Sequence, residues 1–327
     1  MSPKNEREYR RVLEESFKGS AMGTFVGDAL GRQVEGWSRP MIQEVHGLLT
    51  SMARGTYTDD TEMMMGIMES LVENPQFDPG LTATKFVANF SPYRGYGGRI
   101  YGVMDRLRCG VAWNKAGTDS WGNGGAMRVA PIGFFYYDAP TQLEAAARAC
   151  TLITHHHPLG LAGALVQARA VGLATLKAVR GEPIESAKFV DTVVETATPW
   201  SGEMAEALGS VKTTTRGRSI QETIKGIASQ FPRDVSALGA VPPALASFLL
   251  TDDFRESVIV AVNAGGDTDT IGAMTGAIAG AYYGYSQIPG EWLEPLENGK
   301  KGRSYLIFLA ERLAEIKSKQ DIRHAKC

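Results

Sequence analysis

The sequence has few cysteines, no long apolar run and almost no net charge, and each of these absences excludes a class of protein. Three cysteines in 327 residues, with no pair at the CxxC spacing, argue against a disulfide framework and against a zinc-thiolate site. No stretch of about 18 uninterrupted apolar residues is present, so no membrane span is expected. A net charge of −2 gives no general attraction for nucleic acid or for an anionic membrane.

The N-terminal residues are also unlike a signal peptide. Residues 1–11 are mostly charged or polar, and no apolar core follows them. We therefore expect a cytoplasmic monomer with no stable nucleic-acid partner and no membrane association.

Strand signals are scarce, since no segment shows clean period-two alternation and no series of βαβ units can be traced. Helical periodicity dominates instead. The sequence predicts an all-α protein, a single compact domain of orthogonally packed helices over residues 1–327 with a core of about 16–318. The predicted helices cover residues 16–31, 59–74, 141–153, 159–179, 219–230, 254–263, 271–284 and 303–319.

The first of these helices carries a glycine at every fourth position, at Gly19, Gly23, Gly27 and Gly31. On a helix this spacing makes one stripe, which predicts a neighbouring backbone packed very close to it. Asp28 lies on the same helix, and we expect it to be buried and hydrogen-bonded in a structural role.

Two acidic clusters stand about 200 residues apart. Thr58, Asp59 and Asp60 lie at a helix start, where residues of these types are also common N-caps, and Asp59 with Glu62 matches a D-x-x-E capping pattern. Taken alone, this cluster fits a cap and a ligand set equally well.

The second cluster, 265–270, favours the ligand interpretation. Asp267 and Asp269, spaced i, i+2 on a segment expected to be extended, would point the same way. Four aspartates and the hydroxyls of Thr58 and Thr270 form an all-oxygen set, which suits Mg²⁺, Mn²⁺ or Ca²⁺ rather than zinc. Four negative charges match two divalent cations, so a binuclear centre in a central cleft is expected.

Five blocks in order resemble the ADP-ribosylglycohydrolase family. They are 27–31 followed by Glu35, then 57–61, 122–128, 154–155 and 266–270. Within the family the chain most resembles the branch that removes serine-linked ADP-ribose and poly(ADP-ribose), on the stretches 94–97, 236–242 and 276–284.

The resemblance implies two Mg²⁺ ions, or Mn²⁺, as cofactors, and it assigns roles to particular residues. The implied metal ligands are Thr58, Asp59, Asp60, Asp267, Asp269 and Thr270. The implied catalytic residues are Glu35, Asp60 and Asp269. The expected substrate-binding residues are Gly117, Ser120, Trp121, Gly122, Asn123 and His155.

Some of these assignments also have a reason in the residues themselves. The glycine-rich loop 117–125 is suited to hold a diphosphate through its backbone N–H groups, and Trp121 is suited to stack on adenine. Adjacent histidines cannot all reach one ion, so His156 and His157 are interpreted as surface residues or helix-start donors. Arg128 is a candidate partner for an internal carboxylate.

The resulting hypothesis is a hydrolase that releases ADP-ribose from a modified protein or from poly(ADP-ribose). Divalent metal assists cleavage at the ribose anomeric carbon, and serine-linked and polymeric substrates are favoured. An arginine-linked acceptor, of the nitrogenase-regulating type, is the alternative within the family. An ADP-ribose-binding protein with weak catalysis and an all-α isoprenoid synthase, which also uses aspartate-rich Mg²⁺ motifs, are alternatives of other classes.

Overall fold

The computed structural model describes residues 3–324, and within that range it contains helices and isolated bridges but no β-strand. This confirms the all-α prediction. The α-helices are α1 (Pro3–Gly31), α2 (Arg39–His46), α3 (Asp59–Glu73), α4 (Pro79–Asn89), α5 (Gly98–Arg108), α6 (Trp113–Ala116), α7 (Ala130–Phe135), α8 (Pro140–Leu152), α9 (Pro158–Arg180), α10 (Ser186–Ala197), α11 (Gly202–Val211), α12 (Ile220–Gln230), α13 (Ala237–Leu249), α14 (Phe254–Asn263), α15 (Thr268–Tyr283), α16 (Gly290–Leu293) and α17 (Arg303–His324). Short 3₁₀ turns are η1 (Arg32–Val34), η2 (Pro92–Arg94), η3 (Asn123–Gly125) and η4 (Tyr285–Gln287).

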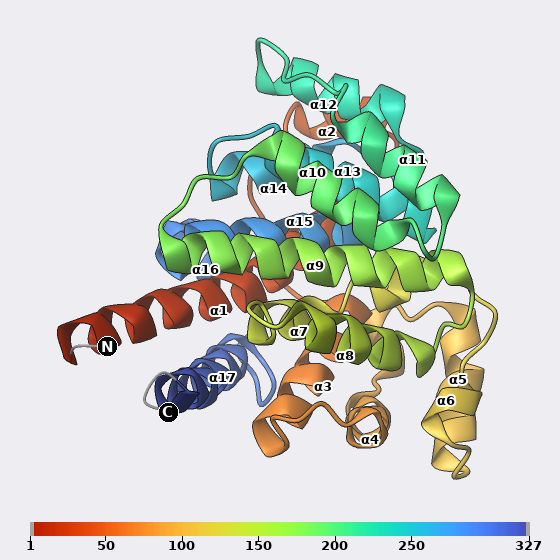
Figure 1. The fold of residues 1–327 in the computed structure, drawn as a ribbon. Coiled ribbons are helices and arrows are strands. Elements are labelled where there is room, and N and C mark those ends of the chain that lie inside the picture. Colours follow the sequence, from red (N-terminus) through yellow and green to blue (C-terminus); the bar gives the residue numbers. More distant parts are fainter. Residues whose placement is uncertain (1–2, 325–327) are drawn as a thin grey trace.

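The centre of the fold is the pair α1 and α15, which run side by side in Figure 1. A Cβ atom built on Gly27 would lie 2.0 Å from the carbonyl oxygen of Gly272, and one on Gly23 would lie 2.1 Å from that of Gly276. The glycine stripe of α1 therefore faces a second stripe on α15, in antiparallel order. The close backbone neighbour expected from the sequence is confirmed, and its identity comes from the structure.

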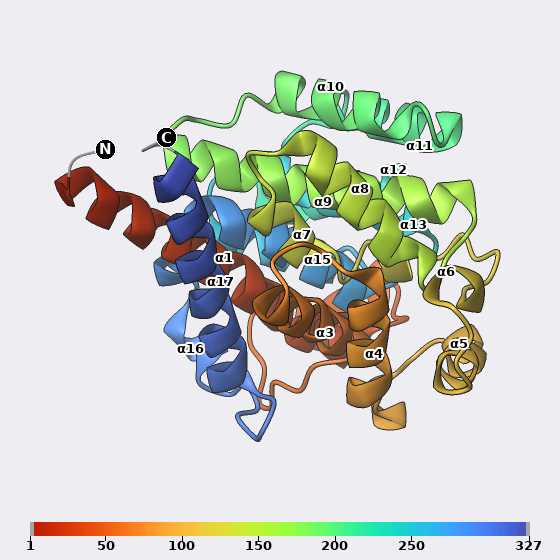
Figure 2. The ribbon, with the colours of Figure 1, turned by 60° about the horizontal axis from the view of Figure 1, so that its bottom comes forward.

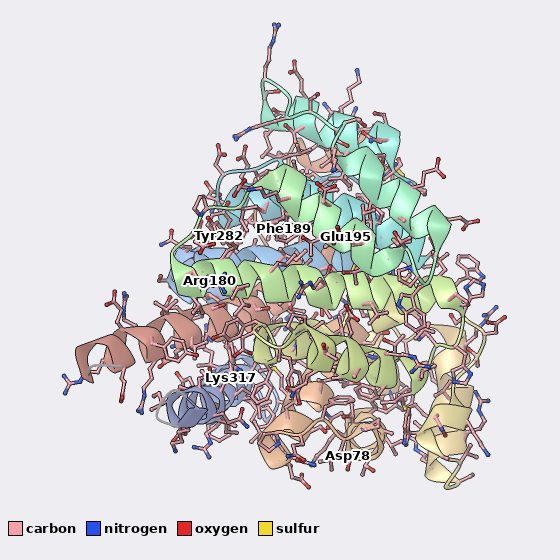
Figure 3. All side chains as sticks on the ribbon, viewed as in Figure 1. Asp78, Arg180, Phe189, Glu195, Tyr282 and Lys317 are labelled. Carbon is pink, nitrogen blue, oxygen red and sulfur yellow. The ribbon has the colours of Figure 1, made fainter. Side chains whose placement is uncertain are left out.

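The other helices form layers around this pair. The long helix α9 packs against α7, α8, α13 and α15, while α10 to α13 lie on one side of it in Figure 1. Helices α3, α4 and α17 lie on the opposite side of α1, as Figure 2 shows from below. Side chains fill the spaces between the ribbons (Figure 3), where Lys317 of α17 forms an ion pair with Asp138 at 2.6 Å.

Helix α9 is long and apolar enough to cross a membrane by length and composition alone. However, 83% of its apolar window is buried inside the protein. Contacts with the surrounding helices α1, α7, α8, α10, α11, α13 and α15 account for that composition without a lipid environment.

Three local expectations are corrected. α15 begins at Thr268, so Asp267 is its N-cap and Asp269 lies in its first turn rather than on an extended segment. At α3 the cap is Thr58, whose hydroxyl accepts from the Asp60 amide, and Glu62 does not complete a capping box. α1 begins at Pro3, 13 residues before the predicted start at residue 16. The helices that were not predicted are α2, α4, α5, α6, α7, α10, α11, α13 and α16.

Candidate metal and substrate site

Asp28, near the end of α1, organises the first acidic cluster. Both of its carboxylate oxygens accept from the amide of Thr58 at 3.0 Å, and Oδ2 also accepts from the amide and hydroxyl of Thr61 at 3.2 and 2.6 Å. The side chain is fully buried. Asp28 thus ties the start of α3 to α1, which is the structural role expected of it.

The two clusters meet where α3 and α15 begin. Asp60 Oδ2 accepts from the hydroxyls of Thr58 at 3.1 Å and Thr270 at 3.5 Å, so its carboxylate is bonded to a residue 210 positions away. One carboxylate oxygen from each of Glu35, Asp267 and Asp269 lies within 4.8 Å of the others. The second oxygen of Asp60 is buried and has no hydrogen-bond partner.

The electrostatics of this cluster favour a cation. Burial and neighbouring carboxylates raise the pKa of Asp59 to about 8 and raise the pKa of Asp60 and of Asp269 well above the ordinary value. Partial desolvation and the Asp267 charge likewise raise the pKa of Glu35. Within residues 3–324 none of these carboxylates forms an ion pair with lysine or arginine.

A donor set of carboxylate and hydroxyl oxygens, with one buried oxygen left unbonded, fits a hard divalent cation. A bound cation would favour the ionised carboxylates and so reverse the upward pKa shifts. The residues that would hold it are the predicted ligand set at the starts of α3 and α15.

A cavity of about 490 Å³ opens beside the cluster. Its second wall is the loop 118–124, which is held by backbone hydrogen bonds from Thr118 N to Thr154 O at 3.0 Å and from Asn123 N to Val235 O at 3.0 Å. The Asn123 side chain donates to Asp267 Oδ2 at 2.5 Å. The loop and the acidic cluster are therefore linked directly, and the cavity lies between them.

His155 lines this cavity and is held as a neutral ring. Burial and the nearby Arg128 charge lower the pKa of His155 to about 3. Arg128 donates to the hydroxyl of Thr154 at 2.7 Å, and that hydroxyl lies 2.7 Å from His155 Nδ1. If the Thr154 hydroxyl donates its proton to Nδ1, the ring proton lies on Nε2, beside Gly122.

Comparison with known proteins identifies the family to which a chain with this acidic cluster and cavity belongs. A model of the family described as ADP-ribosylglycohydrolase matches residues 10–322. The chain belongs to the ADP-ribosylglycohydrolase family.

Individual relatives agree with this assignment. The chain is 34% identical over 314 residues to an uncharacterized protein of Archaeoglobus fulgidus, a match that covers 93% of this chain and 97% of that protein. It is 32% identical over 333 residues to the ADP-ribosylhydrolase ARH3 of Gallus gallus, over 86% of this chain and 89% of that protein. It is 29% identical over 294 residues to the ADP-ribosyl-(dinitrogen reductase) glycohydrolase of Rhodospirillum rubrum, over 85% and 89% respectively.

A solved structure has the same architecture. The ADP-ribosylglycohydrolase-related protein complex superposes with a TM-score of 0.74 at 28% identity, covering 94% of this chain and 99% of that chain. Family membership makes this chain an ADP-ribosyl glycohydrolase, and it favours that activity over an isoprenoid synthase.

Most of the predicted site residues come together around the cavity. Those that line it are Glu35, Asp59, Asp60, Ser120, Trp121, Gly122, Asn123, His155, Asp267, Asp269 and Thr270. Two do not line it. Thr58 acts through its bond to Asp60, and Gly117 packs where a Cβ atom would lie 2.6 Å from His156 Nε2.

Other side chains are placed differently from the expectation. Arg128 is fully buried without a carboxylate partner, and it donates to Cys150 O and Thr154 instead. His157 caps α9 by accepting from the amide of Leu159, so it is an acceptor rather than a donor.

One whole wall of the cavity was missed. It consists of residues from η2 to α5, namely Gly95, Gly97, Gly98, Arg99, Ile100 and Val103. The glycine-rich stretch 95–98 marked a loop in the sequence, but no chemical pattern tied that loop to the acidic clusters.

Proposed function

We propose that this chain removes ADP-ribose from modified acceptors by divalent-metal-assisted cleavage at the ribose anomeric carbon, with serine-linked and polymeric ADP-ribose favoured. The observation that carries the proposal is the cavity itself. One wall is acidic and suits a cation, and a second wall has loop 118–124 and the neutral ring of His155. A ligand with a ribose diol at one end and a diphosphate at the other matches both walls.

Two Mg²⁺ or Mn²⁺ ions are proposed to occupy the acidic wall, bound by Thr58, Asp59, Asp60, Asp267, Asp269 and Thr270. When bound, such ions supply Lewis-acid charge that orients sugar hydroxyls and stabilises negative charge. The support from this chain is its oxygen-only donor set and the unbonded buried oxygen of Asp60.

The remaining roles belong to the chain's own side chains. Glu35 is exposed beside Asp267 and Asp269, and its raised pKa suits proton transfer to or from water and the leaving group. His155 Nε2–H and the loop amides are proposed to hold the diphosphate. Trp121, 48% exposed at the cavity wall, is proposed to stack on adenine.

Serine-linked and polymeric substrates are favoured because of the stretches 94–97, 236–242 and 276–284, which resemble the branch with that activity. The similarity to ARH3 from several vertebrates supports the same choice. Arginine-linked ADP-ribose is the alternative, supported by the similarity to the Rhodospirillum rubrum enzyme.

The test is a mass-spectrometric product assay on defined seryl-, arginyl- and poly-ADP-ribosylated substrates. Each is incubated with Mg²⁺, with Mn²⁺ and with EDTA. We expect free ADP-ribose from the seryl and polymeric substrates, dependent on metal and lost in Asp269→Ala. Release from the arginyl substrate alone would transfer the proposal to the alternative acceptor. Full activity in Asp269→Ala would refute the metal mechanism.

A further inference from the structure

Arg94 lies outside the cavity but next to the segment 57–62, which carries three of the proposed metal ligands. It is the last residue of η2, and the three glycines that follow within residues 95–98 line the cavity. Its guanidinium stacks on the ring of Tyr57, 3.5 Å from the ring centroid. Nη1 donates to Tyr57 O at 2.9 Å, and the group is bidentate to Glu297 at 2.5 and 3.2 Å.

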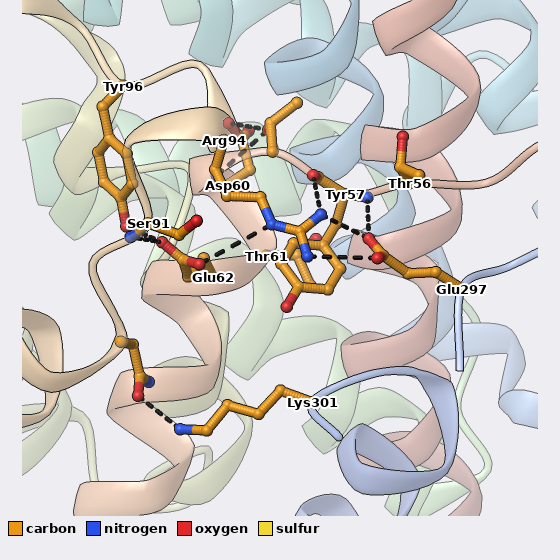
Figure 4. A network of polar contacts seen from close by, with 12 residues as sticks. Thr56, Tyr57, Asp60, Thr61, Glu62, Ser91, Arg94, Tyr96, Glu297 and Lys301 are labelled. Atoms are coloured by element: carbon orange, nitrogen blue, oxygen red, sulfur yellow. Dashed lines mark hydrogen bonds and ion pairs between the residues drawn. The ribbon is translucent and has the colours of Figure 1, made fainter. Parts of the chain in front are cut away.

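The same guanidinium reaches the other end of the segment. Its Nε lies 3.8 Å from Glu62 Oε1, and Glu62 also accepts from the Tyr96 hydroxyl at 2.6 Å and from the Ser91 amide at 3.0 Å. Figure 4 shows Arg94 between Glu62 on α3 and Glu297, with Tyr57 beneath it. Tyr57 precedes Thr58 directly and Glu62 follows Asp60 by two residues, so the contacts bracket the ligand segment.

Glu297 completes the arrangement from the loop before α17. Its carboxylate accepts from the Tyr57 amide at 3.0 Å as well as from Arg94. Backbone hydrogen bonds from Gly55 N to Pro295 O and from Glu297 N to Gly55 O, at 3.0 and 2.7 Å, hold the two chain segments together. The ligand segment is thus held by two other stretches of chain, 91–96 and 295–297.

We propose that Arg94 is a positioning residue, which sets the distance between the Asp59–Asp60 ligand pair and the cavity wall formed by Gly95, Gly97 and Gly98. The inference rests on the proposed function. Asp59 is close to this wall, since a Cβ atom on Gly95 would lie 3.9 Å from Asp59 Oδ1. Arg94 does not line the cavity, so its effect on catalysis must pass through the residues it holds.

The test compares Arg94→Lys with Arg216→Lys. Arg216 also pairs with two carboxylates, Asp252 and Glu256, but it is exposed and neither it nor its partners line the cavity, so it is the matched control. Lysine keeps the charge and loses the stacking and the bidentate geometry. The readouts are binding of Mn²⁺ alone, followed by electron paramagnetic resonance, and kcat and KM on the preferred ADP-ribosylated substrate.

We expect Arg94→Lys to raise the Mn²⁺ dissociation constant about 10-fold and to lower kcat by about 10-fold or more, with a smaller change in KM. Arg216→Lys should match the wild type in its Mn²⁺ dissociation constant, kcat and KM. Glu297→Gln should shift Mn²⁺ binding in the same direction, and the double variant with Arg94→Lys should be no worse than Arg94→Lys alone, because the two side chains act as one unit.

Wild-type Mn²⁺ affinity and kcat in Arg94→Lys would overturn the inference, as would a loss of thermal stability with unchanged Mn²⁺ binding. A wild-type chain that binds Mn²⁺ but cleaves none of the ADP-ribosylated substrates would refute the proposed function alone, because the Mn²⁺ comparison still decides the role of Arg94. A wild-type chain that binds neither Mn²⁺ nor Mg²⁺ would overturn both.

Discussion

Gly31→Ala is expected to uncouple activity from folding, because Gly31 contacts the turn that carries Asp269. Its backbone is α-helical, with φ −68° and ψ −36°, so alanine introduces no backbone strain there. Its Cβ atom would lie 2.1 Å from Thr268 O and 2.6 Å from Asp269 N, whereas ordinary contact begins near 3.4 Å. The first turn of α15 therefore has to retreat from α1 by roughly 1 Å.

Two opposing effects determine how much stability Gly31→Ala loses. Overpacking of this kind costs about 1–3 kcal/mol, and replacing a helical glycine by alanine returns up to about 1 kcal/mol. The net loss of stability is therefore about 1–2 kcal/mol, which leaves the protein folded. A misplacement of about 1 Å at a catalytic centre lowers turnover by about 100-fold, so activity should fall much further than stability.

Two matched variants test whether displacement of Asp269 causes the loss of activity. Gly19→Ala makes the same clash, 2.1 Å from Gly280 O, at the far end of the helix pair, so it should lose similar stability but keep its activity. Gly226→Ala in α12 meets no atom within 4 Å and should gain about 0.5–1 kcal/mol. Thermal unfolding and metal-dependent release of ADP-ribose measure both quantities. If Gly19→Ala and Gly31→Ala lose activity equally, displacement of Asp269 is not the cause.

Three further predictions concern the acidic cluster and its loop. The pKa of Asp59 is raised to about 8, so between about pH 4 and pH 8 the native state holds a proton that the unfolded chain has released. The melting temperature in EDTA should therefore fall as pH rises through this range. Addition of Mn²⁺ should restore it. Asp60→Asn should raise the melting temperature in EDTA and abolish metal-dependent turnover; a lower melting temperature would contradict the repulsion argument. Gly266→Ala, at φ +89° and with its Cβ atom 1.8 Å from Arg233 O, should destabilise by about 2 kcal/mol or more. Gly181→Ala, in the left-handed helical region at φ +64° and in open space, isolates the backbone strain of about 1 kcal/mol, and equal melting temperatures would refute the clash.

The sequence was informative where one residue type repeats or where the chemistry is restrictive. The glycine period identified the close face of α1, and four aspartates with two threonines indicated a hard cation before any geometry was known. The helical period of the glycines and the preference of hard cations for oxygen ligands are the same wherever these residues lie in the fold. They did not reveal that Gly272, Gly276 and Gly280 form the opposing stripe.

The errors arose where side chains that usually serve local structure are used over long distances. Glu62 matched a capping box, but its carboxylate accepts from Tyr96 and Ser91. Asp267 is the N-cap of α15, but its side chain accepts no capping hydrogen bond from the helix and accepts instead from Asn123. The contacts of Arg94 with Glu297 span 203 residues and leave no periodic trace in the sequence.

The glycine stripes and the acidic cluster are parts of one arrangement. α1 and α15 are antiparallel, so the C-terminal end of α1 meets the N-terminal end of α15, which favours contact between the opposite ends of the two helix dipoles. The N-termini of α3 and α15 stabilise nearby carboxylates by only about 0.3–1 kcal/mol each, which is too little to offset the repulsion that raises the pKa of Asp59 to about 8. Close packing of rigid helices must therefore hold these like charges together, and a bound cation then adds its binding free energy to the stability of the fold.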